Sequence, residues 1–329
     1  MEALLEIRNL RIAFGKGEER TEPVRDVSFA VPRGGRVAIV GESGCGKSLT
    51  SLAITRLPPV DSSETEGQIS FNGAKRSFSG GASSPGLASL RGRGVSYVFQ
   101  DPSGSLNPVM RIGAQIEEAL PPDFPRRDKK RRTVELLART GLPDPERAAV
   151  SYPCNLSGGQ CQRCSLAMAL AAEPDLLIAD EPTTALDVTT QRIVLNLIDE
   201  LARENGTAVL LITHNLGLVA GRMDAVNVMY AGTIVESGPV ETVLSAPRHP
   251  YTKGLLAAVP ALDAPRGALL RDIPGTVPPP DAWPDGCAFH PRCPRAKPEC
   301  AASAPPLTDC GGARCACFHP FTGGSGDAS

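Results

Sequence analysis

GESGCGKS, at residues 41–48, is the stretch of this chain that decides the fold. It matches the pattern GxxxxGK[ST], and the run RVAIV at residues 36–40, apolar from Val37 onward, predicts the strand that leads into such a loop. Backbone N–H groups of the loop and the N-terminus of the following helix surround phosphate oxygens, while Lys47 neutralises charge and the Ser48 hydroxyl ligates magnesium. The sequence therefore predicts an α/β domain with a site for a nucleoside triphosphate.

A second glycine-rich stretch, LSGGQ at residues 156–160, is more selective than the first. Its serine and two glycines present a hydroxyl and unhindered backbone amides to a γ-phosphate. Asp180 and Glu181 then follow one apolar run, and His214 follows another, as expected where buried parallel strands end at a nucleotide site. In this order the motifs resemble those of the ATPase subunit of an ATP-binding cassette (ABC) protein.

That resemblance implies the fold of an ABC-type P-loop NTPase. We expect an α/β protein with a RecA-like core, an antiparallel β subdomain, a helical subdomain at about residues 100–165 and a cysteine-rich C-terminal extension. The expected boundaries place the nucleotide-binding domain at residues 1–235, a C-terminal region at 236–320 and a disordered tail at 321–329.

The composition excludes several classes of protein. With 329 residues, 41% of them hydrophobic, the chain is long enough for a large core, and its net charge of −2 gives no reason to expect nucleic acid as a partner. The start, MEALLEIRNL, lacks the features of a signal peptide, and no run of about 18 apolar residues predicts a spanning helix. Any role at a membrane is therefore expected to come through partner proteins.

Phosphoryl transfer to water needs positioned charge, a metal ion and an oriented water. Asp180 would hold magnesium through water, and Glu181 would be the general base for the attacking water. Gln100, at the end of its own strand, would contact the magnesium and the attacking water. His214 resembles the switch histidine that contacts the γ-phosphate. Phe14 is the aromatic residue expected to stack on adenine, with a core phenylalanine as the alternative. The predicted catalytic residues are Glu181, His214 and Gln100, and the predicted magnesium ligands are Ser48, Gln100 and Asp180.

ATP is the nucleotide that the resemblance implies. In this family the signature serine contacts the nucleotide of a partner across a head-to-tail dimer, and Asp187 resembles the D-loop aspartate that links the two sites. A second ABC subunit, identical or related, is therefore expected. The predicted nucleotide-binding residues come from both glycine-rich stretches and their surroundings: Phe14, Gly41, Ser43, Gly44, Cys45, Gly46, Lys47, Ser48, Leu49, Asp180, Ser157, Gly158, Gly159, Gln160 and Asp187.

Several stretches narrow the family: FQDP at 99–102, SLNP at 105–108, DEPTTALDVTTQ at 180–191 and RHPYT at 248–252. From about residue 5 to about residue 320 the chain resembles the ATPases of dipeptide and oligopeptide importers, of the OppD/DppD type. The resemblance implies peptide uptake through two transmembrane permease subunits and an extracytoplasmic peptide-binding protein, with the ATPase peripheral on the cytoplasmic face of the inner membrane. Alternatives are the same role for nickel, opines or another small solute, and a soluble ABC ATPase acting on ribosomes or DNA.

Ten cysteines fall into two groups, four within the first 164 residues and six between 287 and 317. With an ATP site and no export signal, a reducing compartment is expected, where clustered cysteines hold metal or stay as thiols more often than they form disulfides. The tail group resembles the C-terminal region of the importer ATPases, which favours a [4Fe–4S] cluster. Zinc and free thiols are the alternatives; Cys310 and Cys315 are extra thiols, and Cys315 competes as the fourth ligand. The expected cluster ligands are Cys287, Cys293, Cys300 and Cys317.

The signature region departs from the family pattern, because Cys161 follows Gln160 where the family has a basic residue. Activity is expected to persist, since the phosphate contacts come from the serine and glycine amides before it. Cys161 and Cys164 are expected to be small packing residues. An alternative hypothesis has these thiols, with Cys154 nearby, face the partner's Cys45 and make the enzyme sensitive to oxidation.

Overall fold

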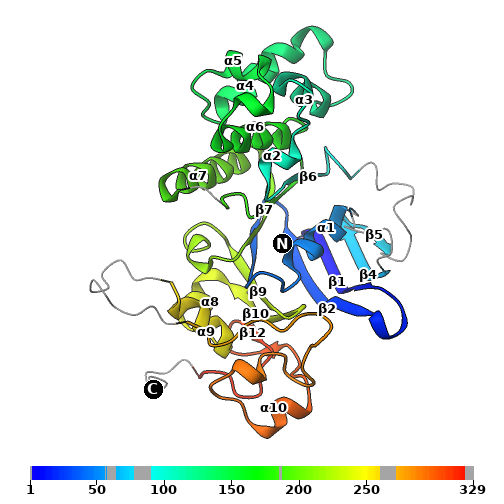
Figure 1. Cartoon of the computed structure of the whole chain (residues 1–329), viewed down its shortest axis with the longest axis vertical. Helices are drawn as coiled ribbons and strands as arrows, with labels where there is room; N and C mark the ends of the chain where they lie inside the picture. Colours follow the sequence, from blue (N-terminus) through cyan, green and yellow to red (C-terminus); the bar gives the residue numbers. More distant parts are fainter. Residues whose placement is uncertain are drawn as a thin grey trace. The chain divides into compact units, whose positions relative to one another are not determined.

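The fold of this chain comes from a computed structural model, which describes residues 2–55, 57, 64–77, 90–184, 187–259 and 272–322 (Figure 1). Contacts divide the chain into two units. We call residues 32–35 and 83–211 the helical unit, and residues 2–31, 36–82 and 212–329 the phosphate-loop unit. Residues 323–329, which make up most of the predicted disordered tail, and residues 185–186, beside the predicted D-loop aspartate, lie outside the described residues.

The phosphate-loop unit contains a four-stranded sheet in the order β2-β1-β4-β5. Strand β4 pairs antiparallel with both β1 and β5, and buried apolar residues face one another across β1 and β4, for example Leu5 and Phe71. This sheet agrees with the antiparallel β subdomain that the sequence led us to expect. Its elements are β1 (Ala3–Phe14), the 3-10 helix η1 (Gly17–Glu19), β2 (Thr21–Pro32), β4 (Glu64–Phe71) and β5 (Ala74–Ser77).

The same unit holds five strands of a second, mixed sheet, in the order β11-β12-β10-β9-β3. Strand β3 runs parallel to β9, whereas β10 pairs antiparallel with β9 and with β12. Strand β3 is buried from its second residue onward and leads through residues 41–46 into helix α1, which is the order a phosphate loop requires. The elements up to residue 259 are β3 (Arg36–Val40), α1 (Lys47–Thr55), η4 (Leu216–Leu218), β9 (Ala225–Tyr230), β10 (Thr233–Pro239), α8 (Val240–Ser245) and α9 (Pro250–Ala257).

Residues 272–322, which we call the extension, complete the phosphate-loop unit. Strand β12 adds to the edge of β10, and the N–H of Ala316 donates to the carbonyl oxygen of Val235 at 2.8 Å. The ring of Phe289, a residue 2% exposed, packs 5.2 Å from the ring of Tyr230. The extension is therefore anchored by a strand edge and an aromatic cluster. Its elements are η5 (His290–Arg292), α10 (Pro298–Ala302), β11 (Thr308–Asp309) and β12 (Arg314–Cys315).

The helical unit contributes three strands in the order β8-β7-β6, and β6 runs parallel to β7. Strands β7 and β8 are buried throughout, as expected for apolar strands covered on both faces. These strands are β6 (Val95–Val98), β7 (Leu176–Asp180) and β8 (Ala208–Thr213), and the last two residues of β8 belong to the phosphate-loop unit.

The helices of this unit pack around α6, which contacts α2, α3 and α4 and buries Cys161 and Cys164 in the helical core. In the part of the chain that the structure describes, none of the helices has the length and apolarity needed to cross a membrane. The helices are α2 (Pro102–Ser105), α3 (Ile112–Ala119), η2 (Arg126–Asp128), α4 (Lys129–Arg139), α5 (Pro145–Val150), η3 (Pro153–Asn155), α6 (Gly158–Leu170) and α7 (Val188–Asn205).

Candidate functional site

The phosphate loop, residues 41–46, turns sharply between β3 and α1. At two of its positions only glycine fits, because the neighbouring backbone leaves no room for a side chain. A Cβ on Gly41 would come within 2.1 Å of the carbonyl oxygen of Met229. Gly46 has a φ of +99°, and a Cβ there would come within 2.7 Å of the carbonyl oxygen of Pro23. This close approach gives the loop the compact form in which backbone N–H groups can surround a phosphate.

Lys47 opens helix α1 and is 4% exposed. Its Nζ donates to the carbonyl oxygens of Gly41 and Glu42, both at 2.8 Å, and lies 3.8 Å from the Sγ of Cys45. A buried ammonium is stable only with such partners, and these contacts hold the cation at the loop. Burial raises the pKa of the Cys45 thiol, so this side chain stays protonated beside the lysine.

The other predicted nucleotide contacts in this unit are more accessible. Ser43 and Gly44 are exposed, and Ser48 and Leu49 are half-buried in the first turn of α1. Phe14 is the last residue of β1 and is also half-buried, so its ring is not enclosed in the core. Stacking of this ring on adenine stays a prediction.

The predicted acidic pair ends strand β7 in the helical unit. Asp180 is 4% exposed, and the Tyr97 hydroxyl donates to its Oδ2 at 2.7 Å. Glu181 has a φ of +46°, a conformation that few residues other than glycine adopt. Its Oε2 accepts a hydrogen bond from Gln100 Nε2 at 3.3 Å and from Thr184 Oγ1 at 2.9 Å. The ends of two parallel strands therefore bring Gln100 and Glu181 together, and the catalytic roles of both stay predictions.

The signature stretch forms the N-terminus of helix α6. The Oγ of Ser157 accepts from the N–H of Gln160 at 3.3 Å, and the Oε1 of Gln160 accepts from the N–H of Ser157 at 2.9 Å. This is a capping box, built from residues three apart. Ser157 and Gly158 are exposed, while Gly159 and Gln160 are half-buried. The positive end of the helix dipole is thus presented to solvent, where an anion would be stabilised.

Asp187 begins helix α7 as its N-cap. Its Oδ1 accepts from the backbone N–H groups of Thr189 and Thr190, both at 3.0 Å, and its Oδ2 accepts from the Thr190 hydroxyl at 2.6 Å. These hydrogen bonds, led by that of the Thr190 side chain, lower the pKa of Asp187, so the carboxylate is ionised. The capping role was not predicted, although Asp before Val-Thr-Thr is a typical helix start. The D-loop role stays a prediction.

The predicted residues divide between the two units. The phosphate loop, Phe14 and the exposed His214, which directly follows β8, lie in the phosphate-loop unit. The acidic pair, Gln100, the signature stretch and Asp187 lie in the helical unit. Sequence reasoning missed Tyr97 and Thr184, which hold the two acidic side chains. Tyr97 stands three positions before Gln100, and the strand pattern through this run could have indicated it.

All four cysteines predicted as cluster ligands line one small cavity of the extension. Burial raises the pKa of Cys287, with smaller contributions from two of the other thiols. It raises the pKa of Cys293 to about 11, with smaller contributions from the other three. A hydrogen bond with the Cys315 thiol lowers the pKa of Cys317 to about 7. Soft sulfur donors suit the predicted metals. Among the described residues, however, no three His, Cys, Asp or Glu side chains are arranged to hold a metal ion.

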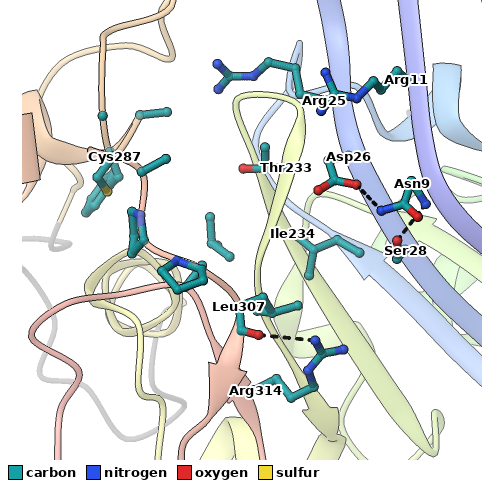
Figure 2. A pocket seen from close by; sticks show the side chains of 18 residues that line it. Asn9, Arg11, Arg25, Asp26, Ser28, Thr233, Ile234, Cys287, Leu307 and Arg314 are labelled. Atoms are coloured by element: carbon teal, nitrogen blue, oxygen red, sulfur yellow. Dashed lines mark hydrogen bonds between the residues drawn. The ribbon is translucent and has the colours of Figure 1, made fainter. Parts of the chain in front are cut away.

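A larger pocket of about 550 Å³ lies between strands β1, β2 and β10 and the extension (Figure 2). Two hydrogen bonds tie polar groups of its lining to neighbours. Asn9 Nδ2 donates to Asp26 Oδ1 at 2.7 Å, and Arg314 Nη2 donates to the carbonyl oxygen of Leu307 at 3.2 Å. Cys287 lines this pocket as well as the small cavity. The pocket therefore marks where the extension rests against the strands.

Cys161 and Cys164, the cysteines that follow the signature stretch, are 2% and 0% exposed. Burial raises the pKa of Cys164 to about 12, so that thiol is not ionised near neutral pH. Cys45 is also fully buried. The packing interpretation of these cysteines is therefore favoured over the oxidation hypothesis, which needs accessible thiolates.

Two family models match this chain. The family model described as ABC transporter matches residues 24–184, and the one described as oligopeptide/dipeptide transporter, C-terminal region, matches residues 235–300. The second match begins within strand β10, covers helices α8 and α9, and extends to residue 300 of the extension.

Curated relatives match along nearly the whole chain. A Brucella ovis protein named for peptide import and ATP binding is 46% identical, with 95% of this chain and 96% of the relative covered. The probable D,D-dipeptide transport ATP-binding protein DdpD of Escherichia coli is 44% identical, with coverages of 96% and 97%. The dipeptide transport ATP-binding protein DppD of Bacillus subtilis is 45% identical, with coverages of 89% and 88%.

Solved structures of ABC cassettes match 72% of this chain. The dimeric structure of MJ0796, a bacterial ABC transporter cassette, superposes with a TM-score of 0.63 at 27% identity, covering 72% of this chain and 98% of that cassette. A dimeric post-hydrolysis state of the same cassette, bound to ADP and Pi, gives a TM-score of 0.62. The fold is that of an ABC ATPase cassette, α/β with a mixed sheet, and the chain belongs to the family of ABC transporter ATP-binding subunits that serve peptide import.

Proposed function

We propose that this chain hydrolyses ATP to power the uptake of dipeptides and oligopeptides through partner permease subunits. Similarity to transport ATP-binding proteins along nearly the full length supports the substrate class. The contact between Gln100 and Glu181, at the ends of two parallel strands, is the observation that carries the hydrolytic role. A carboxylate that activates water must have a fixed orientation. Glu181 follows one of the two strands, and Gln100, which follows the other, donates a hydrogen bond to its carboxylate.

Glu181 is the proposed general base. Asp180, Ser48 and Gln100 would ligate Mg²⁺ directly or through water, and the metal would neutralise charge on the phosphates. Lys47 supplies a second positive charge at the loop, and His214 would contact the γ-phosphate. The support lies in the strand-end positions of Asp180 and Glu181 and in the cation held at the loop.

The nucleotide of one subunit is proposed to lie between its own phosphate loop and the signature stretch of a second ABC subunit, identical or paralogous. The exposed N-terminus of α6 supports this, because a helix dipole and the Ser157 hydroxyl together favour an anion. Asp187 would link the two sites as the D-loop residue.

The proposed organisation has a nucleotide-binding domain at residues 1–235, with its helical subdomain at about 100–165, and a transporter C-terminal region at 236–320. Two permease subunits would hold the ATPase on the cytoplasmic face of the inner membrane, and an extracytoplasmic protein would deliver the peptide. The match of the C-terminal region to peptide transporters supports these partners.

The four cysteines of the small cavity are proposed to bind a [4Fe–4S] cluster, with zinc as the alternative. A metal there would cross-link segments that have little core of their own. Metal and sulfide analysis of anaerobically purified wild type and Cys293→Ala tests this. Iron and sulfide at about four each per chain, lost in the variant, support the cluster, and zinc alone replaces it. A metal-free protein contradicts both.

Reconstitution with permeases and binding protein in liposomes tests the function as a whole. Glu181→Gln should lower ATP hydrolysis and dipeptide uptake by about 10² to 10⁴-fold, because it removes the general base while keeping the side-chain shape. Binding of MgATP should persist. Uptake of nickel without uptake of dipeptides would contradict the substrate class, and equal hydrolysis by the variant would contradict the role of Glu181.

A further inference from the structure

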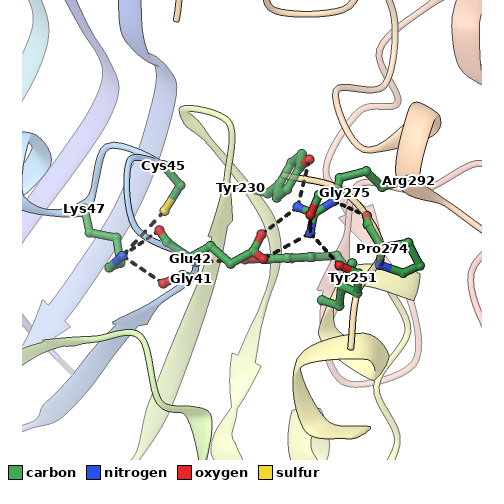
Figure 3. Close-up of polar contacts among 10 residues, drawn as sticks. Gly41, Glu42, Cys45, Lys47, Tyr230, Tyr251, Pro274, Gly275 and Arg292 are labelled. Atoms are coloured by element: carbon green, nitrogen blue, oxygen red, sulfur yellow. Dashed lines mark hydrogen bonds and ion pairs between the residues drawn. The ribbon is translucent and has the colours of Figure 1, made fainter. Parts of the chain in front are cut away.

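Glu42, the second residue of the phosphate loop, is engaged through all three of its polar groups (Figure 3). Its backbone N–H donates to the Tyr251 hydroxyl at 2.9 Å, and its carbonyl oxygen accepts from Lys47 Nζ at 2.8 Å. Its carboxylate accepts two hydrogen bonds from Arg292, at 2.7 and 3.1 Å. Glu42, whose carbonyl oxygen contacts the phosphate-binding lysine, is therefore held by two residues that lie far away in the sequence.

Arg292 is itself fixed within the extension. Its Nε donates to the carbonyl oxygen of Pro274 at 2.8 Å, and its Nη2 donates to those of Ile273 and Gly275, both at 3.1 Å. The Arg292 side chain is 6% exposed and the Glu42 side chain is 31% exposed, so the ion pair is partly shielded from solvent. A planar guanidinium that binds a carboxylate with two parallel hydrogen bonds sets both distance and orientation.

Tyr251 holds the loop from helix α9. The residue is fully buried, and its ring centroid lies 4.7 Å from that of Tyr230 and 5.3 Å from that of Phe289. His249 caps the same helix by accepting the Tyr251 N–H at 3.0 Å. The RHPYT stretch, which the sequence showed only as a family marker, therefore places a rigid hydroxyl against the loop.

We propose that Arg292 and Tyr251 are positioning residues that hold the phosphate loop in its nucleotide-binding shape, which makes the extension part of the ATP site. This inference rests on the proposed binding of ATP at the loop. Release of Glu42 would leave the loop free to adopt other shapes, and ATP binding would then have to order it again. Affinity for nucleotide falls as a result, while the hydrolytic groups of the helical unit are unchanged.

Titration calorimetry of full-length protein with the magnesium complex of a non-hydrolysable ATP analogue tests the proposal. Arg292→Gln should weaken binding about tenfold, in keeping with the loss of a charge-assisted hydrogen-bond pair. In ATPase assays KM should rise with kcat within about twofold. Tyr251→Phe, which removes one hydroxyl, should weaken binding less, by about three- to tenfold. Arg314→Gln, a change elsewhere in the extension, is the matched control and should bind like wild type.

A double-mutant cycle separates positioning from general stability. In a Glu42→Gln background, Arg292→Gln should cost less than about twofold, because its partner is already altered. An equal loss in both backgrounds, with matching losses of thermal stability, would overturn the proposal in favour of a purely structural role. Unchanged affinity in Arg292→Gln would also overturn it. Failure of wild type to bind the nucleotide would instead refute the proposed function.

Discussion

The two glycine-rich stretches of this chain are held in opposite ways. The signature stretch is fixed locally, by the reciprocal hydrogen bonds of Ser157 and Gln160, three residues apart. The phosphate loop is fixed from a distance, since Tyr251 and Arg292 reach Glu42 across 209 and 250 positions of sequence. The first needs one helix to form, and the second needs the whole phosphate-loop unit.

Because one stretch is held locally and the other from a distance, the two depend on different parts of the fold. A capping box forms whenever its helix forms, so the signature stretch is insensitive to the extension. The loop shape depends on tertiary packing of the aromatic cluster around Tyr230 and Phe289, which also anchors the extension. Substitutions in the extension should therefore affect nucleotide binding at the phosphate loop more strongly than they affect the signature helix.

The largest expected difference between the two stretches appears when one methyl group is added to a glycine of each. A Cβ at Gly41 would stand 2.1 Å from the carbonyl oxygen of Met229, whereas a Cβ at Gly158 has no neighbour within 4 Å. Gly41→Ala should cost about 1–3 kcal/mol or more in stability and abolish MgATP binding, because backbone would have to move. Gly158→Ala should fold like wild type and, as a single subunit, bind MgATP at its own phosphate loop like wild type. Urea unfolding and calorimetry check both, and a tolerated Gly41→Ala would contradict the described loop.

Acid should weaken the distant support of the loop before it affects the signature helix. Burial lowers the pKa of His249, the cap of α9, to about 3 from 6.5. Below pH 6.5 the unfolded chain therefore binds a proton that the folded chain excludes, and the His249 contribution falls by about 2 kcal/mol between pH 7 and pH 5. Burial raises the pKa of Glu236, whose carboxylate accepts the backbone N–H of His249. That shift makes the folded chain more stable as the pH falls, which opposes the effect of His249.

Denaturant unfolding at several pH values isolates the histidine. His249→Asn keeps a capping side chain but cannot titrate, so its stability should fall less than that of wild type from pH 7 to pH 5. The difference between the two proteins removes most of the Glu236 contribution. Parallel pH profiles for wild type and variant would show that His249 does not govern this response.

Much of the site was predictable where the cause is local. The strand, loop and helix around Lys47 follow from a contiguous pattern of residues. The contact between Gln100 and Glu181 follows from a general rule, that polar residues ending neighbouring parallel strands meet at one edge. The grouping of the tail cysteines in one cavity was also anticipated, from resemblance rather than from spacing.

The support of the loop was not predictable from the sequence. Tyr251 lies in the RHPYT stretch, which indicated only the family, and Arg292 directly precedes Cys293, a predicted cluster ligand. Nothing in the pattern around either residue indicates that it reaches Glu42, because such contacts depend on how the extension packs. The φ of +46° at Glu181 was likewise not predictable, because residues other than glycine rarely adopt this conformation and no local pattern marks it.

A smaller effect should come from removing the local cap. Ser157→Ala deletes the hydroxyl that accepts the Gln160 N–H, and loss of such a cap costs about 1 kcal/mol. Binding of MgATP by one subunit should be unchanged, because the loop does not depend on α6. Ser43→Ala, at an exposed loop position, is the control and should change stability by less than about 0.5 kcal/mol. A fall in nucleotide affinity of Ser157→Ala as large as that of Arg292→Gln would erase the contrast.

The smallest expected effect concerns the thiols that lie in each stretch. Cys45 in the loop and Cys161 and Cys164 after the signature are buried, whereas Cys154 is exposed. Because thiolates react and burial suppresses both ionisation and access, a maleimide should label Cys154 of the folded chain well before these three. Mild diamide treatment should therefore leave ATP hydrolysis unchanged, in wild type and in Cys154→Ser alike. Inhibition that is retained in Cys154→Ser and abolished by Cys161→Ala would restore the oxidation hypothesis, and it would require that the start of α6 opens during turnover despite its local cap.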